Sequence, residues 1–394
     1  MNILHVVPSY LPAYRYGGPI VSVHGLCRGL VAAGHHVTVC TTSVDGPDEL
    51  DVATGQAVDV DGVKVFYFAA NQRHKGWSRR LYRSNDMARY LQQEAGKFDL
   101  IHLHSVYLWP TWFAAKQAVR YKVPYIISPR GMLVRGLIER KNRWLKTAWL
   151  KLFERSNLSN ATALHFTSNQ EKADAHEVMR QIGLNNKTGF VLENGVDVLQ
   201  QKTAPIDDIR TDNEVLYLGR ISWKKGLELL INAIQQCPEV RLTIAGNDDE
   251  NYIRKLQKLI DSKGLRSRVT FTGFVDNKQK EQLLRRSTIL ALCSDNENFG
   301  NVVLEAMAYA CPVVVTAGVG ASAAVKAHDA GVVVDPDANA IATAINRLLQ
   351  DVSLREQCGL NGQKAVRDSF SWPVIASRMA SQYQKLMLGD SVPL

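Results

Sequence analysis

Short apolar, β-branched runs alternate with longer amphipathic stretches along almost all of the 394 residues, and this alternation constrains the fold most. In the first half the expected strands are Ile3–Val7, His36–Thr41, Val63–Phe68, Leu100–His104, Tyr125–Ser128, Ala163–Thr167 and Phe190–Leu192. In the second half they are Val215–Leu218, Val240–Ala245, Val269–Thr272, Ile289–Leu292, Val313–Thr316 and Val332–Val334. Continuous apolar runs are typical of parallel strands buried on both faces. The repeated strand–helix units therefore predict an α/β fold with two doubly wound sheets.

The chain length and one polar segment predict two domains. A chain of 394 residues exceeds what one ordinary core supports. The segment Asp197–Asn213 is polar and is the expected linker. We therefore predict an N-terminal domain over residues 1–200 and a C-terminal domain over residues 201–373. The amphipathic helix after Pro373 is expected to return residues 374–394 to the first domain.

The charge is distributed unevenly. Residues 1–200 hold 24 Lys and Arg against 16 Asp and Glu, whereas the remaining residues hold 23 against 22. This points to an anionic partner on the first half, and nucleic acid, anionic lipid and a phosphorylated substrate all remain open at this point. The apolar runs are too short to span a membrane, the N-terminus does not resemble a signal peptide, and the six cysteines are scattered. We expect a cytoplasmic protein, either free or peripheral on the inner face of the membrane.

The most informative stretch is Ser294–Thr316, SDNENFGNVVLEAMAYACPVVVT. It follows an apolar strand and places seven residues between Glu297 and Glu305. The segment around Gly300 is expected to open a helix, whose unpaired N–H groups can bind phosphate oxygens. A carboxylate beside that point can accept hydrogen bonds from the hydroxyls of a ribose or a sugar. The plain alternative is one acid that complements the helix dipole and one solvated glutamate.

Two cations lie in the turn that follows the first strand of the second half. Arg220 and Lys225 are enclosed by Gly219 and Gly226, and together they could neutralise a diphosphate without a metal ion. An ordinary solvated basic turn is the alternative.

Further candidate binding residues follow strands of the first half. Gly17 and Gly18 come between a strand and a helix, and Arg15 lies in a segment that could contact an acceptor. His104 ends a strand at the edge where ligands of α/β proteins collect, although either it or its neighbour His102 could be a core histidine. Arg130 follows another strand end and could bind an anionic acceptor group or pair with an acid.

The string Ser294–Thr316 resembles the E-x7-E signature of the retaining glycosyltransferases of family 4, which have the GT-B fold of two Rossmann-like domains facing across a cleft. Further blocks of the same family are Gly17-Gly18-Pro19, DLIHLHS (Asp99–Ser105), Asn194-Gly195-Val196-Asp197, LGRISWKKG (Leu218–Gly226) and IAGND (Ile244–Asp248). The catalytic residues implied are His104, Arg220, Lys225 and Glu297. The donor-binding residues expected are Gly17, Gly18, Gly219, Gly246, Phe299, Gly300, Asn301, Val302 and Glu305. The sequence departs from the family at Ala310-Cys311 and in GVGASAAV after Thr316.

The resemblance implies transfer of a sugar from a UDP- or GDP-linked donor to an acceptor hydroxyl, with the anomeric configuration retained. The acceptor is expected to be a carbohydrate or a lipid-linked sugar of cell-surface polysaccharide or glycolipid synthesis. We expect no cofactor and no metal, because the DxD-like strings at Asp59–Asp61 and Asp335–Asp337 are typical of turns. The alternatives are an epimerase acting on nucleotide sugars and, from a different class, a basic nucleic-acid-binding protein. Since no nucleic-acid-binding module is recognisable, we do not expect a nucleic-acid partner.

A basic stretch with aromatic residues lies in the first half. Residues Arg130–Arg155 hold eight Lys and Arg and two acids, and Trp144, Leu145, Ala148, Trp149, Leu152 and Phe153 recur at helical spacing. A helix of this kind near residues 140–155 could lie on an anionic membrane surface. The same stripe could face the core while the basic residues cover the solvent side.

Overall fold

The computed structural model describes residues 1–71, 81–134, 144, 148–185, 187–198, 213–248 and 251–389. The chain divides into two compact units, Met1–Asn194 with Trp372–Leu394 (unit 1), and Gly195–Ser371 (unit 2). The first boundary falls six residues before the expected 200/201 and the second two residues before the expected 373/374. Most of the expected linker, residues 199–212, lies outside the described residues.

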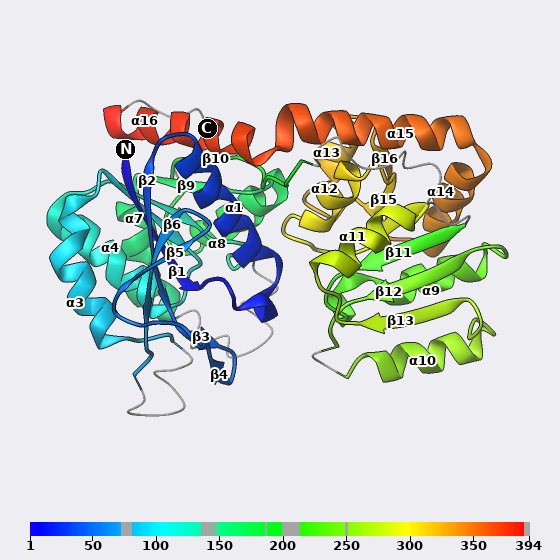
Figure 1. Ribbon diagram of the computed structural model, residues 1–394, viewed down its shortest axis with the longest axis horizontal. Coiled ribbons are helices and arrows are strands. Elements are labelled where there is room, and N and C mark those ends of the chain that lie inside the picture. Colours follow the sequence, from blue (N-terminus) through cyan, green and yellow to red (C-terminus); the bar gives the residue numbers. More distant parts are fainter. Residues whose placement is uncertain are drawn as a thin grey trace. The chain divides into compact units, whose positions relative to one another are not determined.

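Unit 1 is built on a twisted sheet whose described strands have the order β10-β9-β8-β7-β1-β2-β6-β5 (Figure 1). The strands are β1 (Asn2–Ser9), β2 (His36–Thr42), β5 (Ala57–Val60), β6 (Val63–Phe68), β7 (Leu100–His104), β8 (Tyr125–Ser128), β9 (Ala163–Phe166) and β10 (Gly189–Val191). All neighbours are parallel except the hairpin β5–β6. The chain winds outward in both directions from the β1–β7 pair, which is therefore the switch point of this sheet.

Helices cover this sheet. They are α1 (Gly18–Ala32), α3 (Asn85–Glu94), α4 (Trp109–Tyr121), α7 (Arg155–Asn160), α8 (Asn169–Arg180) and the returning α16 (Trp372–Leu388). Helix α16 packs closely on α1, since a Cβ atom at Gly25 would lie 2.1 Å from the Trp372 ring. The serine that begins α8 behaves as a helix cap, because Ser168 Oγ accepts a hydrogen bond from the N–H of Glu171 at 3.1 Å.

Unit 2 has a parallel sheet with the order β13-β12-β11-β14-β15-β16 (Figure 1). The strands are β11 (Glu214–Leu218), β12 (Arg241–Ala245), β13 (Val269–Gly273), β14 (Ile289–Leu292), β15 (Val313–Thr316) and β16 (Gly331–Val334). The helices between and after them are α9 (Leu227–Gln235), α10 (Ile253–Ser262), α11 (Asn277–Arg286), α12 (Asn301–Ala308), α13 (Ser322–Ala327), α14 (Ala338–Gln350) and α15 (Val352–Ala365). This is the strand order of a dinucleotide-binding Rossmann fold, with its switch point between β11 and β14.

The expected doubly wound α/β fold is confirmed, and every expected strand appears within two residues of its expected bounds. The short strands β3 (Val44–Asp45), β4 (Asp48–Glu49) and β5 were not predicted from the sequence. They are antiparallel and only two to four residues long, too short to stand out as apolar runs. At the first DxD-like string only Asp61 and Gly62 form the turn, because Asp59 belongs to β5 and its Oδ1 accepts a hydrogen bond from the N–H of Gly62 at 3.1 Å.

Candidate functional site

The carboxyl edge of the unit 2 sheet brings two loops together at its switch point. Strands β11 and β14 are parallel neighbours, with Val215 opposite Ile289 and Leu216 opposite Leu290. The loops that leave them, residues 219–226 and 293–300, therefore begin side by side. These two loops and the start of α12 carry most of the residues singled out in the second half of the sequence.

The loop after β11 is fixed by close backbone contacts. The N–H of Gly219 donates to the carbonyl of Ala245 at 2.9 Å, and the N–H of Ile221 donates to the carbonyl of Asn247 at 2.7 Å. A Cβ atom at Gly246 would lie 1.9 Å from the carbonyl oxygen of Gly219. Glycine at position 246 is therefore required for the loops after β11 and β12 to approach each other.

The two cations of this loop differ in their surroundings. Arg220 is exposed, and its carbonyl accepts a hydrogen bond from the Tyr217 hydroxyl at 2.8 Å. Lys225 ends a 3-10 turn immediately before Gly226, where φ is +64° and a Cβ would lie 1.8 Å from the Cys293 carbonyl oxygen. The loop is thus held against the start of the neighbouring loop while Arg220 projects into solvent.

A glycine turn after β15 supports the loop that carries Glu297. The N–H of Glu297 donates to the carbonyl of Gly318 at 2.9 Å, and the N–H of Gly320 donates to the Glu297 carbonyl at 2.9 Å. A Cβ at Gly318 would lie 2.0 Å from the carbonyl oxygen of Asp295, and one at Gly320 would lie 2.1 Å from that of Asn298. Both glycines belong to the segment GVGASAAV, which was noted in the sequence as a departure from the family but was given no role there, although a G-x-G shortly after a strand is a usable signal.

Helix α12 begins where the sequence predicted a helix start. Gly300 is its N-cap residue with φ of +87° and provides no side-chain cap. Phe299 is buried in the core, and its carbonyl accepts a hydrogen bond from the N–H of Ala321 at 2.7 Å. Asn301 and Val302 form the first turn and are partly buried. The backbone of this turn, more than its side chains, is what a ligand could contact.

Both glutamates of the E-x7-E string form ion pairs with lysines. Lys225 Nζ donates to Glu297 Oε2, so the structure brings together two residues separated by 71 others. Lys280, on α11, lies 3.1 Å from Glu305 Oε1. Lys280 was not predicted as a site residue, because nothing in its local sequence relates it to α12.

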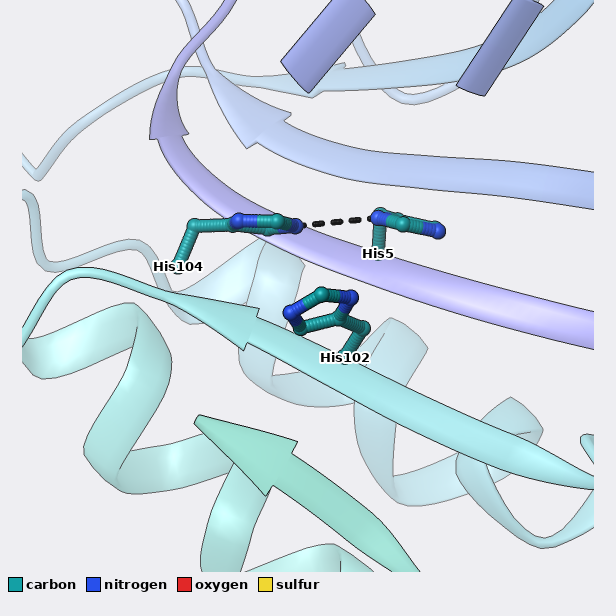
Figure 2. A group of neighbouring side chains, drawn as sticks. All are labelled: His5, His102 and His104. Atoms are coloured by element: carbon teal, nitrogen blue, oxygen red, sulfur yellow. Dashed lines mark hydrogen bonds between the residues drawn. The ribbon is translucent and has the colours of Figure 1, made fainter. Parts of the chain in front are cut away.

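In unit 1, three histidines lie on one face of the sheet at the switch point (Figure 2). His5 of β1 and His104 of β7 are joined by a hydrogen bond of 2.9 Å between Nδ1 and Nε2. His102 has a partner at each nitrogen, with Tyr383 Oη at 2.6 Å and Ser128 Oγ at 2.7 Å. His102 is therefore a core histidine with both nitrogens bonded, and His104, two residues further along the same strand, is buried on the same face.

Arg130 connects this cluster to a loop. Its Nη1 donates to Asn194 Oδ1 at 2.9 Å, and its Nη2 lies 3.3 Å from Nδ1 of His104. The loop itself is held by Glu171, whose Oε1 accepts a hydrogen bond from the N–H of Gly131 at 2.6 Å. In the described part of the chain Arg130 thus contacts an amide and an imidazole.

The direction of these bonds determines the histidine tautomers. Since a guanidinium only donates, Nδ1 of His104 accepts and its ring proton is on Nε2, from which it donates to His5. His104 then has no lone pair left for a metal ion, although ligand atoms of the three histidines lie within 4.8 Å of one another. The His104 side chain is 1% exposed, so a bond from its ring to a sugar would require His5 or Arg130 to release it.

Burial keeps the histidines of this face neutral. It lowers the pKa of His5 to about 3, and the nearby positive charge of Arg130 adds to the effect. The pKa of His165 falls to about 3 for the same two reasons. The pKa values of His102 and His104 are also held well below the ordinary value, first by burial and then by the neighbouring histidines and Arg130.

The remaining predicted residues of unit 1 lie at the start of α1. Gly17 is the N-cap residue with φ of +69°, and Gly18 is exposed at the first position of the helix. Arg15 is half-exposed and pairs with Asp48 at 3.2 Å and with Asp45 at 3.8 Å. The side chain expected to contact an acceptor is thus already in contact with two carboxylates.

The basic aromatic stretch is described at residues 144 and 148–155, and residues 135–143 and 145–147 lie outside the described part. Leu150 is buried, whereas Leu152 is 72% exposed. Trp149 packs on Phe153 with ring centroids 4.6 Å apart, and Phe153 meets Trp112 of α4 edge-on at 5.8 Å. One side of this segment therefore faces the core and the other presents apolar surface to solvent. Within the described ranges, no helix combines the length and apolar character needed to cross a bilayer.

Comparison with known proteins identifies relatives of both units. The family model of glycosyl transferases group 1 matches residues 199–365, and that of the glycosyl transferase 4-like domain matches residues 17–182. An uncharacterized glycosyltransferase of Methanocaldococcus jannaschii is 27% identical over 409 residues, which cover 98% of this chain and 99% of that protein.

Two solved structures share the fold over the whole length. Sucrose-phosphate synthase from Thermosynechococcus elongatus gives a TM-score of 0.74 at 23% identity and covers 99% of this chain and 100% of its own. HepE from Anabaena, in complex with UDP and glucose, gives a TM-score of 0.73 at 22% identity and covers 98% of this chain and 100% of its own.

The buried neutral histidines predict a loss of stability in mild acid. In the unfolded chain each histidine takes up a proton below about pH 6.5, whereas in the folded chain His5 and His165 stay neutral to about pH 3. The free energy of unfolding should therefore fall with pH below about 6.5, approaching ~1.4 kcal/mol per pH unit for each such histidine. Urea unfolding between pH 7 and 5 measures this slope. His5→Gln should make the slope shallower and the exposed His36→Gln should not, whereas equal slopes would contradict the assignment.

Proposed function

We propose a donor, a reaction and a set of binding residues for this chain, which belongs to the GT4-type glycosyltransferases with the GT-B fold. The reaction is transfer of a sugar from a nucleoside-diphosphate sugar to an acceptor hydroxyl, with retention of the anomeric configuration and without a metal ion. The observation that supports this most is the gathering of Arg220, Lys225, Glu297, Gly300 and Glu305 around the switch point of one sheet.

The diphosphate would be held by two cations and a helix start. Arg220 is exposed to receive it, and the first turn of α12, whose N-cap residue Gly300 has no side chain, presents the positive end of a helix dipole. Lys225 has three N–H donors, so it can hold Glu297 and still donate to a phosphate oxygen. These charges compensate the leaving group as negative charge develops on it, which is commonly a large catalytic contribution.

The two glutamates would bind the hydroxyl groups of the donor. Glu297 lies in the loop beside Lys225 and would contact the sugar that is transferred. Glu305 lies in α12, beyond the turn proposed for the phosphates, and would accept from the ribose hydroxyls. In the reaction the bond from C1 to the diphosphate oxygen breaks and a bond from C1 to the acceptor oxygen forms on the same face. The acceptor proton passes to the departing diphosphate.

In unit 1 we propose that Arg15 and Arg130 contribute to acceptor binding and that His104 helps to position a sugar. The contacts of Arg130 with Asn194 and His104 would be exchanged for an acceptor oxygen. A donor-side role for Gly17 and Gly18 stays a prediction. The acceptor class that we propose is a carbohydrate or lipid-linked sugar of cell-surface polysaccharide or glycolipid synthesis.

The donor proposal predicts stabilisation by nucleotides without a metal. HepE is a protein of this fold whose structure holds UDP, and UDP and GDP are therefore the first ligands to test. In EDTA, a nucleotide at 100 times its Kd should stabilise the binding unit by about 2.7 kcal/mol, which thermal-shift measurement detects. The product glycoside should carry the donor's anomeric configuration by NMR. Recovery of epimerised donor without glycoside would instead indicate an epimerase, and stabilisation that requires Mg²⁺ would contradict metal independence.

The roles in unit 2 predict different kinetic effects for two substitutions. Glu305→Ala removes hydroxyl recognition and should weaken nucleotide binding about 10-fold or more. Lys225→Ala removes charge compensation and should lower kcat about 100-fold or more. Titration calorimetry and steady-state kinetics separate the two effects, with the exposed Lys326→Ala as the control. Full activity in either variant would show that the assigned role is wrong.

We also propose that the face of unit 1 around Leu152 and Trp149 docks on an anionic membrane. Leu152 is 72% exposed there and follows the exposed Lys151. The ammonium group of Lys116 lies 4.7 Å from the centroid of the Trp112 ring, which packs against Phe153. Exposed apolar surface next to basic residues is typical of segments that bind the membrane surface. Leu152→Asp should reduce binding to phosphatidylglycerol vesicles about 10-fold in a sedimentation assay. The control is Leu360→Asp in unit 2, where a leucine is 60% exposed. Equal binding by the two variants would exclude docking through this face.

A further inference from the structure

We propose that Lys280 is a positioning residue for donor binding. Through its ion pair it holds the carboxylate of Glu305 in the orientation that receives the ribose hydroxyls. The inference rests on the proposed function of Glu305 and adds to it a residue from another helix. Lys280 itself is not required to touch the donor.

The contact between the two side chains is direct and partly shielded from solvent. Lys280 Nζ lies 3.1 Å from Oε1 of Glu305. The side chains are 31% and 20% exposed, so water competes for this pair less than for one on an open surface.

Lys280 projects from a helix turn that is itself well fixed. Asp276 and Gln279 form a reciprocal capping box, with bonds of 2.8 and 3.0 Å between side chain and backbone. The N–H of Lys280 donates to the Asp276 carbonyl at 2.8 Å. Leu283 and Leu284 are buried one turn later and anchor α11 in the core. The base of the lysine side chain therefore has little freedom to move.

The ion pair with Lys280 occupies one of the two carboxylate oxygens of Glu305. In the described part of the chain its hydrogen bond with Lys280 uses Oε1, so Oε2 is left to accept from a ligand. Fixing one oxygen also fixes the plane of the carboxylate, which orients the lone pairs of the other oxygen. The ammonium group further offsets the negative charge of Glu305, which would otherwise repel the diphosphate proposed to bind at the start of the same helix.

A purely structural role is the competing explanation, and the structure supplies its control. A second contact joins α11 to the end of α12, because the guanidinium of Arg285 lies 5.1 Å from the centroid of the ring of Tyr309, the C-cap residue of α12. Removing Arg285 should loosen α11 against α12 without touching Glu305. Lys280 and Arg285 can therefore be compared as two links between α11 and the α12 segment. Only Lys280 contacts Glu305, the residue proposed to bind the ribose.

The test measures hydroxyl recognition in the full-length chain. Titration calorimetry gives the Kd values of UDP and of 2′,3′-dideoxy-UDP, or of the guanosine pair if GDP is the nucleotide that binds. Wild type should prefer the hydroxylated nucleotide about 10-fold or more. Lys280→Met should reduce this ratio about fivefold, towards that of Glu305→Ala, and raise the donor KM more than it lowers kcat. Lys280→Arg should restore the ratio of the two Kd values. Arg285→Met should lower the Tm and leave this ratio unchanged.

The outcomes separate this inference from the function on which it rests. Undiminished preference for the hydroxylated nucleotide in Lys280→Met, with clear preference in wild type, overturns the role of Lys280 alone. Absence of preference in wild type overturns the ribose role of Glu305 and the role of Lys280 with it. Failure of wild type to bind UDP, GDP or ADP overturns the proposed donor class.

Discussion

The parallel pairing of β11 with β14 is the constraint on which the proposed donor site depends. It places the carboxyl ends of two strands side by side, and their loops can then meet only if the backbones approach within van der Waals contact. Glycine makes this approach feasible at Gly226, which lies against the carbonyl of Cys293. Gly246 does the same for the loops after β11 and β12, because it lies against the carbonyl of Gly219. These two glycines thus serve the packing of loops before they serve any ligand.

Charge pairing organises the same edge of unit 2. Each glutamate of the E-x7-E string is matched by one lysine, Lys225 for Glu297 and Lys280 for Glu305. Such pairs keep acidic side chains next to a site for an anionic substrate without a net repulsion. The exposed Arg220 then leaves the loop with an excess of positive charge where the diphosphate is proposed to bind.

The switch point of the unit 1 sheet carries a buried cluster of histidines instead of charge pairs. One face of this sheet carries His5, His102 and His104, which are buried, neutral and hydrogen-bonded, and Arg130 determines the tautomer of His104 and, through it, that of His5. The loss of any bond from a buried polar network is costly, and Nε2 of His5 is already a buried nitrogen without a partner among the described residues. The stability of this unit therefore depends on pH and on the contacts that hold Arg130 in place.

The sequence by itself determined the parallel strands, the two doubly wound sheets and the family, because apolar runs and the E-x7-E string are local patterns. The short antiparallel strands β3, β4 and β5 were found only in the structure. The sequence also identified Glu297, Lys225 and Glu305 one by one. Only the tertiary structure decided which of them pair, that Lys280 joins Glu305, and that His104 is bonded to His5. The reason is physical: local spacing governs which strand or helix forms, whereas contacts between residues 25 to 99 positions apart follow from strand order and helix packing.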